Sequence, residues 1–344
     1  MEFYKILEMW YLNNQRDLPW RKSSNPYFVW LSEIILQQTR IQQGLSYYNT
    51  FIDHYPTVKA LANANEDDVL KDWQGLGYYS RARNLHSSAK YICEELNGKF
   101  PTTYKEIIKL KGVGDYTASA IASICFNEKT AVVDGNVYRV LSRYFNIDTP
   151  INSSKGIKYF KELAQELIVN ANPKEYNQAL MDFGSMVCKP QNPICETCPL
   201  ADGCLAKAKN TIDKLPVKEK KIKIKNRFLN FIVFTDGQHT VLEKRTGNGI
   251  WKNLYQFPLI EFDKVVSEEE LSQDSLLLNT PYSNISLFNT EPWVHKLSHQ
   301  HLFTQFWIVE TNQITNNNIQ PWNEVSNFAV PKLIHNFLDS YQTK

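Results

Sequence analysis

Four cysteines lie close together in the pattern Cys188-x6-Cys195-x2-Cys198-x5-Cys204, with three prolines among them. Thiolates on a short, proline-stiffened loop can surround one compact centre, either a tetrahedral zinc ion or an iron–sulfur cluster. Zinc sites usually present two short Cys-x2–4-Cys pairs, and this loop has one. The chain also starts without the charged-then-apolar pattern of a secretory signal, which disfavours disulfides. The spacing therefore favours an iron–sulfur cluster held by all four cysteines.

Two carboxylates stand in surroundings that suit acid–base chemistry. Glu33 lies within the apolar stretch 31–36, where burial of an unpaired carboxylate would raise its pKa and make it a candidate general acid. The alternative is a salt-bridged Glu that faces a loop. Asp134 lies between an apolar run and Gly135, so we expect its side chain to project from a helix start. A plain N-cap is the alternative there.

A third pattern, Leu110-Lys-Gly-Val-Gly-Asp-Tyr-Thr-Ala118, places Gly112 and Gly114 between two apolar helical runs. Glycine allows close approach of the backbone, and the N–H groups that open the second helix favour an anion. Such a helix-hairpin-helix can grip the DNA backbone without reading bases. A simple helical turn is the alternative.

The elements that must position these residues divide the chain into two regions. Residues 1–205 show apolar side chains at helical spacing, whereas residues 228–344 begin with a strand-like run, an Asp236-Gly237 turn and a hairpin partner, and we expect an α+β region there. The intervening linker, 206–227, is rich in Lys. The composition, with 43% hydrophobic and 22% charged residues, fits a globular protein and excludes a disordered or fibrous one.

Charge is distributed unevenly although the net charge is only +2. The linker is strongly basic and residues 228–344 are acidic, a pattern consistent with nucleic-acid binding. A solvated linker explains the same charge. No apolar run is long enough for a membrane helix, so we expect a cytoplasmic protein with no membrane partner.

Together these motifs resemble the helix-hairpin-helix DNA glycosylase superfamily and, within it, the MutY-type adenine DNA glycosylases. Further matching stretches are Leu18-Pro-Trp-Arg21, Gly75-Leu-Gly-Tyr-Tyr-Ser-Arg-Ala-Arg83 and Phe183-Gly184. The resemblance implies mainly α glycosylase domains with a 4Fe–4S cluster loop, followed by an α+β Nudix-like domain. The related endonuclease III branch carries a Lys at the position of Tyr116, and Tyr cannot form the Schiff base that cleaves the strand. Glu33 and the extra C-terminal domain also favour base removal without strong lyase activity.

The resemblance also implies roles for individual residues. Glu33 would protonate the adenine ring and Asp134 would stabilise or covalently trap the oxocarbenium-like sugar, as in glycosidases. Tyr116 would support Asp134 and Asn136 would orient the nucleophile. Arg21 and Gln178 would line the adenine pocket. Because the adenine must leave the duplex to reach this pocket, a wedge is required, and Gln38 and Tyr78 would fill or pry the DNA helix beside 8-oxoguanine.

The C-terminal region resembles a Nudix-like recognition domain through the stretch Gly249–Pro258. We find no R-E-x-x-E-E helix for Mg²⁺ and therefore expect recognition without hydrolysis. Leu297-Ser298-His299 stands where the family usually has Phe-Ser-His, so Ser298 and His299 are candidate contacts to the lesion base and Leu297 departs from the intercalating Phe.

The sequence thus predicts a monomeric, nucleoid-associated base-excision repair glycosylase. Its expected substrate is double-stranded DNA that contains adenine opposite 8-oxoguanine or guanine. Two alternatives remain open: an endonuclease III-like glycosylase with AP lyase activity, and a non-catalytic DNA-binding protein.

Overall fold

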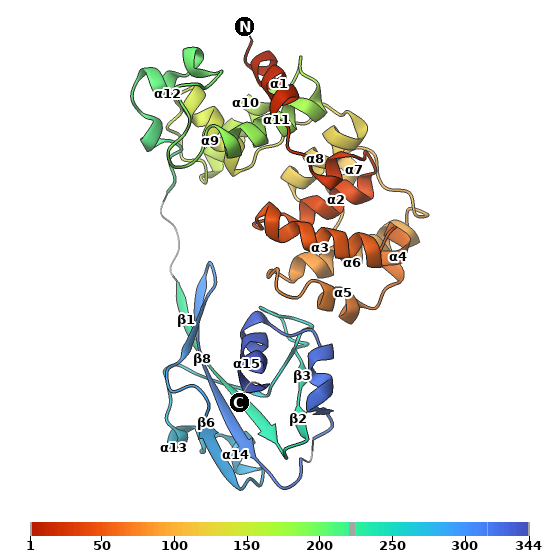
Figure 1. The fold of residues 1–344 in the computed structure, drawn as a ribbon, viewed down its shortest axis with the longest axis vertical. Helices are drawn as coiled ribbons and strands as arrows, with labels where there is room; N and C mark the ends of the chain where they lie inside the picture. The colour runs from red at the N-terminus through yellow and green to blue at the C-terminus, as the bar shows by residue number, and fades with distance from the viewer. Residues whose placement is uncertain (1, 220–223, 315, 343–344) are drawn as a thin grey trace. The chain divides into compact units, whose positions relative to one another are not determined.

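The computed structural model describes residues 2–219, 224–314 and 316–342. Contacts divide the chain into two units. Unit 1 contains residues up to Asn63 and from Asn84 to the end of the helical region, and unit 2 contains Ala64–Arg83 and the C-terminal region. Each unit is described separately (Figure 1).

Unit 1 is built from helices. Its α-helices are α1 (Phe3–Asn14), α2 (Pro26–Ile35), α3 (Ile41–His54), α4 (Val58–Asn63), α6 (Ser80–Glu94, of which residues 84–94 belong here), α7 (Tyr104–Ile107), α8 (Asp115–Phe126), α9 (Gly135–Tyr144), α10 (Ser154–Leu167), α11 (Pro173–Met186) and α12 (Leu205–Ala208). Short 3-10 helices span Pro19–Arg21, Ala201–Gly203 and Ile212–Lys214. The predicted helical region is confirmed. Several helices begin where proline or an Asn cap favours a start, as at α2, which has Asn25 as N-cap and Pro26 in its first turn.

Two packing groups in unit 1 place the predicted catalytic residues. The apolar faces of α1, α9, α10 and α11 share one core, which contains Leu7, Val140, Phe160 and Phe183. Helix α8 contacts both α11 and α2, and so joins this group to the second group, in which α2 also packs on α3. Most residues of α2 are fully buried, and Glu33 is half-buried.

Unit 2 is a mixed sheet with helices on both faces. Its strands are β1 (Lys225–Thr235), β2 (His239–Val241), β5 (Leu259–Phe262), β6 (Asn284–Leu287), β7 (Trp293–Lys296), β8 (Gln300–Glu310) and β9 (Ile319–Pro321), and β3 (Glu243–Lys244) pairs with β4 (Tyr255–Gln256) in a separate sheet. The hydrogen-bonded order is β6-β8-β1-β2-β9, with β5 also on β1 and β7 also on β8. The long central strands β1 and β8 run parallel. The hairpin partner predicted after the Asp236-Gly237 turn is therefore divided between two sheets, as β2 and β3.

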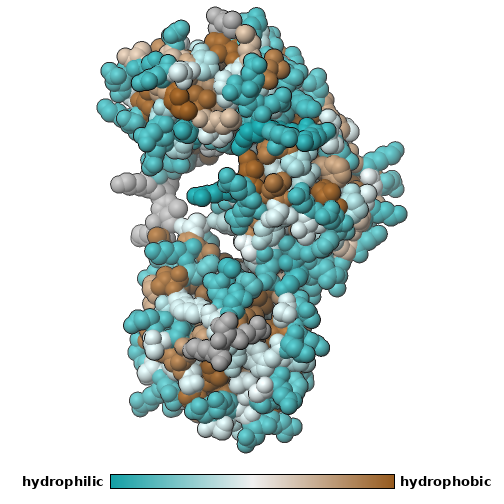
Figure 2. Space-filling model, in the orientation of Figure 1, coloured by the Kyte–Doolittle hydropathy of each residue, from teal (hydrophilic) through white to brown (hydrophobic). Residues whose placement is uncertain are grey.

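Both faces of the β1–β8 pair are covered, which explains why these strands are nearly continuous apolar runs. On one face, Phe231 and Phe306 pack against Phe337 of α15 (Lys332–Gln342). On the other, Trp307 packs with Leu271 of α13 (Glu268–Leu271) and with residues of α14 (Ser275–Leu278). The visible surface is largely hydrophilic, with apolar side chains in separate patches (Figure 2).

Residues 64–83 belong to unit 2 although they lie far from it in sequence. They include helix α5 (Glu66–Asp72) and the loop Gly75–Tyr79 that leads into α6. Nothing in the sequence pattern indicated this grouping. Of the predicted linker, residues 220–223 lie outside the described residues, and β1 begins at Lys225, three residues before the predicted strand. Among the described residues, no helix is long and apolar enough to span a membrane.

Candidate active site

The predicted acid and the predicted carboxylate lie together in a cleft of unit 1. A cavity of about 610 Å³ is lined by Glu33, Tyr116 and Asp134, and also by Gln38 and Gly114. A second cavity of about 760 Å³ is lined by the same three residues and by Arg21 and Asn136. Glu33 comes from α2, Tyr116 from α8, Asp134 from the start of α9 and Met181 from α11, and α3 also contributes to the second cavity. The fold thus brings together residues that are up to about 150 positions apart.

Glu33 has the electrostatics that the apolar stretch predicted. Burial and, less strongly, the neighbouring Asp134 carboxylate raise its pKa, interactions with the Tyr116 hydroxyl and the Arg21 guanidinium lower it, and the resulting pKa is about 7. At neutral pH a substantial fraction of Glu33 therefore holds its proton. A carboxylic acid with this pKa can donate a proton under physiological conditions.

Asp134 is both the N-cap of α9 and a wall of the cleft. Its Oδ1 accepts hydrogen bonds of 2.8 Å from the backbone N–H groups of Asn136 and Val137, and its Oδ2 accepts one of 2.8 Å from Asn136 Nδ2. Burial raises the pKa of Asp134, and these three donors lower it, with a net shift upward from its ordinary value. The N-cap geometry confirms the projection from a helix start and shows that capping and cavity lining occur together.

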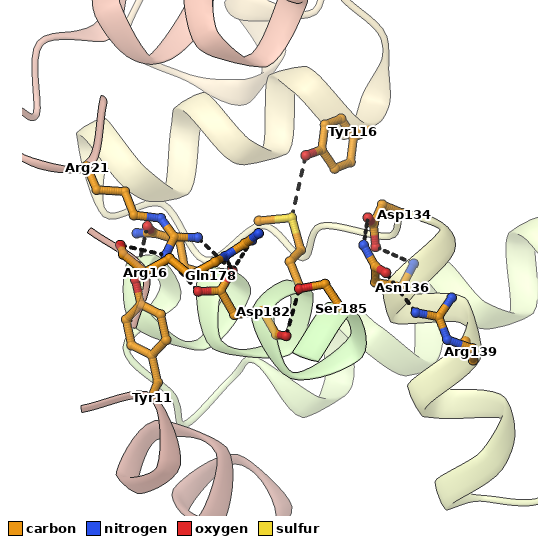
Figure 3. Close-up of polar contacts among 11 residues, drawn as sticks. Tyr11, Arg16, Arg21, Tyr116, Asp134, Asn136, Arg139, Gln178, Asp182 and Ser185 are labelled. Atoms are coloured by element: carbon orange, nitrogen blue, oxygen red, sulfur yellow. Dashed lines mark hydrogen bonds and ion pairs between the residues drawn. The ribbon is translucent and has the colours of Figure 1, made fainter. Parts of the chain in front are cut away.

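Tyr116 interacts electrostatically with both carboxylates, Glu33 and Asp134. Burial and both carboxylates hold the pKa of its hydroxyl well above the ordinary value, so it stays protonated. The hydroxyl donates to Met181 Sδ at 3.4 Å (Figure 3). The neutral hydroxyl interacts with the Glu33 carboxylate and lowers the pKa of Glu33.

A chain of hydrogen bonds leads from Asp134 to the cysteine loop. Asn136, which donates to Asp134, accepts a 2.8 Å hydrogen bond from Arg139 Nη2. The same guanidinium donates to Gly184 O at 2.6 Å and, through Nε, to Cys188 O at 2.7 Å. Figure 3 shows this alignment of Asp134, Asn136 and Arg139. The side chain of Asn136 is thereby fixed from both sides.

A second cluster holds Arg21, which lines the larger cavity. Arg21 Nη1 and Nη2 bind the two oxygens of the buried Asp182 at 2.7 and 2.9 Å, and Arg16 binds the same carboxylate. The two arginines lower the pKa of Asp182 despite its burial. Tyr11 lies under the Arg21 guanidinium and donates to Gln178 Oε1 at 3.2 Å. The predicted pocket residues Arg21 and Gln178 are therefore in one group (Figure 3); Arg21 lines the larger cavity, and Gln178 is buried.

The cysteine loop offers four free thiols that influence one another. Cys188, Cys195 and Cys204 each raise the pKa of Cys198, in addition to the effect of burial, so all four sulfurs lie within electrostatic range. In the described part of the chain, no three His, Cys, Asp or Glu side chains converge on a point for a single ion. A four-iron cube does not need such convergence, because each thiolate binds its own iron.

A buried arginine supplies positive charge beside these thiols. Arg143 Nη1 lies 3.5 Å from Cys188 Sγ and donates to Lys189 O at 2.7 Å, and its Nη2 donates to Pro190 O. Burial raises the pKa of Cys188, and the Arg143 cation offsets part of that rise. Deprotonated thiolates are the ligands that an iron–sulfur cluster requires, so the residues present fit that group.

The glycine hairpin has the predicted geometry. Gly112 has φ +80°, and a Cβ there would come within 2.6 Å of Asn84 Cβ, whereas Gly114 is the N-cap of α8. Gln38 is exposed, with φ +58°, on the loop after α2. The start of α8, Gly114 and Gln38 line the same cavity as Glu33.

The remaining predicted residues are in unit 2. Tyr78 is 51% exposed, with φ +47°. Ser298 and His299 form the exposed turn between β7 and β8, where Ser298 Oγ lies 3.4 Å from His299 Nδ1. Leu297 packs against the core of unit 2 and so differs from an exposed intercalating side chain.

Sequence reasoning missed Arg16, Asp182, Arg139 and Arg143. The last two had a usable signal: they are four residues apart in an otherwise apolar helical stretch, which places both charges on one face. Asp182 and Arg16 are 166 positions apart and had none.

Comparisons with known proteins agree with this arrangement. Residues 31–168 match the HhH-GPD superfamily base excision DNA repair protein, residues 188–204 match the iron-sulfur binding domain of endonuclease III, and residues 230–340 match the NUDIX domain. The chain therefore contains a helix-hairpin-helix glycosylase fold, a 4Fe–4S cluster-binding loop and a Nudix-like domain.

Relatives named adenine DNA glycosylase match this chain over most of its length, among them two from Buchnera aphidicola. That of Buchnera aphidicola subsp. Baizongia pistaciae is 36% identical, over 94% of this chain and 92% of its own length, and that of Buchnera aphidicola subsp. Schizaphis graminum is 38% identical, over 86% and 83%. Among solved structures, a thermostable thymine-DNA glycosylase matches with a TM-score of 0.56 and 30% identity, over 60% of this chain and 95% of that one.

Proposed function

We propose that this chain, which belongs to the adenine DNA glycosylase family, is a base-excision repair enzyme that hydrolyses the N-glycosidic bond of adenine in duplex DNA. One observation carries the proposal: two carboxylates with different environments face the same cleft. Glu33 has a pKa of about 7, and Asp134 accepts three hydrogen bonds that favour its ionised form. This is the pairing of an acid with an anion that glycoside hydrolysis requires.

The mechanism follows from where charge develops. As the C1′–N9 bond breaks, its electron pair goes to the adenine ring, and protonation of the ring by Glu33 makes the base a better leaving group. The sugar becomes oxocarbenium-like, and the Asp134 anion stabilises it or adds to C1′. Water then supplies the hydroxyl at C1′ and its second proton returns to a carboxylate. Asn136 fixes Asp134 throughout, because Arg139 holds the amide from the other side.

The same cleft disfavours strand cleavage. The position from which a Schiff base would form is occupied by Tyr116, whose protonated hydroxyl cannot form an imine with the sugar. Lys111, the nearest lysine in sequence, is exposed in the hairpin, where its carbonyl accepts from Ser88. We therefore propose a monofunctional glycosylase rather than an AP lyase.

The cysteine loop has a structural part in this scheme. Cys188, Cys195, Cys198 and Cys204 would hold a 4Fe–4S cluster, which when bound cross-links the loop. Arg143 and Arg139 bind carbonyl groups of that loop and both project from α9, the helix that Asp134 caps. Folding of the loop thus supports the helix that carries the anion.

The finer assignments concern the substrate and the partners. We propose that the opposite base is 8-oxoguanine or guanine, contacted by Ser298 and His299, while Gln38 and Tyr78 fill or pry the helix beside it. Residues 1–205 would perform catalysis, 206–227 would act as a basic linker and 228–344 would recognise the lesion, in a monomer that works on the nucleoid. Gly112 and Gly114 would bind backbone phosphates, since the N–H groups at the start of α8 lie next to the cleft.

The test is incubation of the full chain with a duplex that contains one adenine opposite 8-oxoguanine. Strand breaks that form only after alkali treatment support a monofunctional glycosylase. Breaks without alkali would indicate the lyase alternative, and no breaks with either treatment, despite duplex binding, would indicate a non-catalytic binding protein.

A further inference from the structure

We infer that Gln74 and Tyr79 are positioning residues that attach the loop Gly75–Tyr79, called the Tyr78 loop below, to the C-terminal part of unit 2. The C-terminal part of unit 2, which carries Ser298 and His299, would thereby also position Tyr78, the residue proposed to enter the DNA helix. This inference rests on the role proposed above for Tyr78.

The Tyr78 loop has a backbone that needs external support. Gly75, Gly77 and Tyr78 all have positive φ angles, of 102°, 73° and 47°. A left-handed conformation at a bulky residue such as Tyr is unfavourable and persists only where the surroundings enforce it. Its ring is nevertheless half exposed, so the support must act through the backbone and the neighbouring side chains.

One set of contacts closes the loop on itself. Arg81 Nη2 donates to the carbonyl groups of Leu76 and Gly77, at 3.3 and 3.1 Å. The guanidinium also lies over the rings of Trp73 and Tyr78, at 5.1 and 5.8 Å from their centroids. Burial lowers the pKa of Arg81 to about 10, which still leaves it charged at neutral pH. The loop is thereby fixed in shape.

A second set attaches the loop to Val330, a core residue of unit 2. The buried Tyr79 hydroxyl donates to Val330 O at 3.2 Å and accepts from Gly75 N at 3.3 Å. Gln74 Oε1 accepts from Val330 N at 3.3 Å. The backbone N–H and carbonyl of the buried Val330 therefore bind Gln74 and Tyr79, one at each end of the loop. Val330 belongs to the core cluster in which α15 packs against β8.

Helix α5, which precedes the loop in sequence, makes further contacts with the C-terminal part of unit 2. Asp67 pairs with Lys244 at 2.5 Å and accepts from the Tyr255 hydroxyl at 3.2 Å. Lys71 Nζ donates to Ser326 O at 2.5 Å, and burial lowers its pKa. These contacts explain why residues 64–83 group with the C-terminal region.

Two uses of these contacts can be distinguished. If they only stabilise the fold, then loss of the Tyr79 hydroxyl will act on adenine release in the same way whatever residue is at position 78. If they position Tyr78, then that loss will matter only while Tyr78 is present. A double-mutant cycle separates the two cases.

The first measurement is independent of activity. Amide hydrogen exchange of the full chain should show at least about fivefold faster exchange at Gly75 in Tyr79→Phe, because the acceptor of that N–H is removed. Gln74→Leu should do the same at Val330. The matched control is Tyr27→Phe, which removes a buried hydroxyl that donates to Tyr55 O at 2.6 Å in unit 1. Unchanged exchange at Gly75 in Tyr79→Phe would overturn the inference.

The second measurement is single-turnover adenine release from the 8-oxoguanine duplex. Tyr79→Phe should lower the rate about fivefold in the parent and by less than twofold in the Tyr78→Ala background. An equal loss in both backgrounds, or none in either, would overturn the inference. Tyr78→Ala at the parental rate would also overturn it and leave adenine release standing. A parent without adenine release would contradict the proposed function instead, and the exchange experiment would still decide whether the loop is held.

Discussion

The cleft around Glu33 and the turn that carries Ser298 and His299 differ in how far their polar groups are already satisfied. In the cleft, Asp134, Asn136 and Arg139 bind one another, and burial alters the pKa of both carboxylates. At the turn, two exposed side chains contact each other weakly. Chemistry on a sugar needs charges that are fixed before the substrate arrives, whereas base recognition uses groups whose partners are on the DNA.

The comparison predicts the largest effect at Asp134. Asp134→Asn retains the shape but removes the anion that faces the developing positive charge, so single-turnover adenine release should fall by about 10³-fold or more. Duplex affinity should change little, because the role proposed for Asp134 is in the chemistry and not in backbone binding. A rate within tenfold of the parent would show that the carboxylate does not stabilise the sugar.

A smaller loss is expected at Arg139, which holds Asn136 without lining the cleft. Arg139→Met removes the hydrogen bonds to Asn136 and to Cys188 O, and hydrogen bonds to charged groups contribute about 1.5–3 kcal/mol. Adenine release should fall by about tenfold or more. The Asn136→Ala/Arg139→Met double variant checks the route: its rate should be close to that of Asn136→Ala, and fully additive losses would contradict it.

Substitutions at the exposed turn of Ser298 and His299 should give the smallest effect, and it should be on base discrimination instead of the rate of adenine release. Ser298→Ala and His299→Ala should each reduce the preference for 8-oxoguanine over guanine by about tenfold, because one base-directed contact contributes about 1–3 kcal/mol. The release rate at saturating enzyme should stay within twofold of the parent. Val294→Ala, at an exposed position on the preceding strand, serves as the matched control. Unchanged discrimination in both variants would place lesion recognition elsewhere.

Local patterns predicted those parts of the molecule whose causes are local. The apolar stretch 31–36 predicted the raised pKa of Glu33, the turn at Asp236-Gly237 predicted the β1–β2 hairpin, and Gly112 predicted a close approach of the backbone. The buried pair Arg21–Asp182 and the grouping of residues 64–83 with unit 2 could not be predicted in this way. Both depend on contacts between segments far apart in sequence, which periodicity and propensity do not encode.

Gln178 and Leu297 illustrate the same limit at single residues. The resemblance assigned Gln178 to the adenine pocket, and the structure adds that its side chain is buried and accepts a hydrogen bond from Tyr11. The motif at Leu297 suggested a departure from an intercalating residue, and the structure adds that this side chain packs on the core of unit 2. A motif specifies the residue type, while the direction of the side chain depends on the packing around it.

The central claim is that Glu33 supplies the proton, and the pH dependence of adenine release tests it most directly. Measured with subsaturating enzyme, the rate reports groups of the free protein. Because the pKa of Glu33 is about 7 and its protonated form is the active one, the rate should fall about tenfold per pH unit above pH 7. Glu33→Gln should be at least about 10²-fold slower at pH 7 and should lose this alkaline limb. A parental rate that is flat from pH 6 to 9, or a Glu33→Gln rate within tenfold of the parent, would contradict the account.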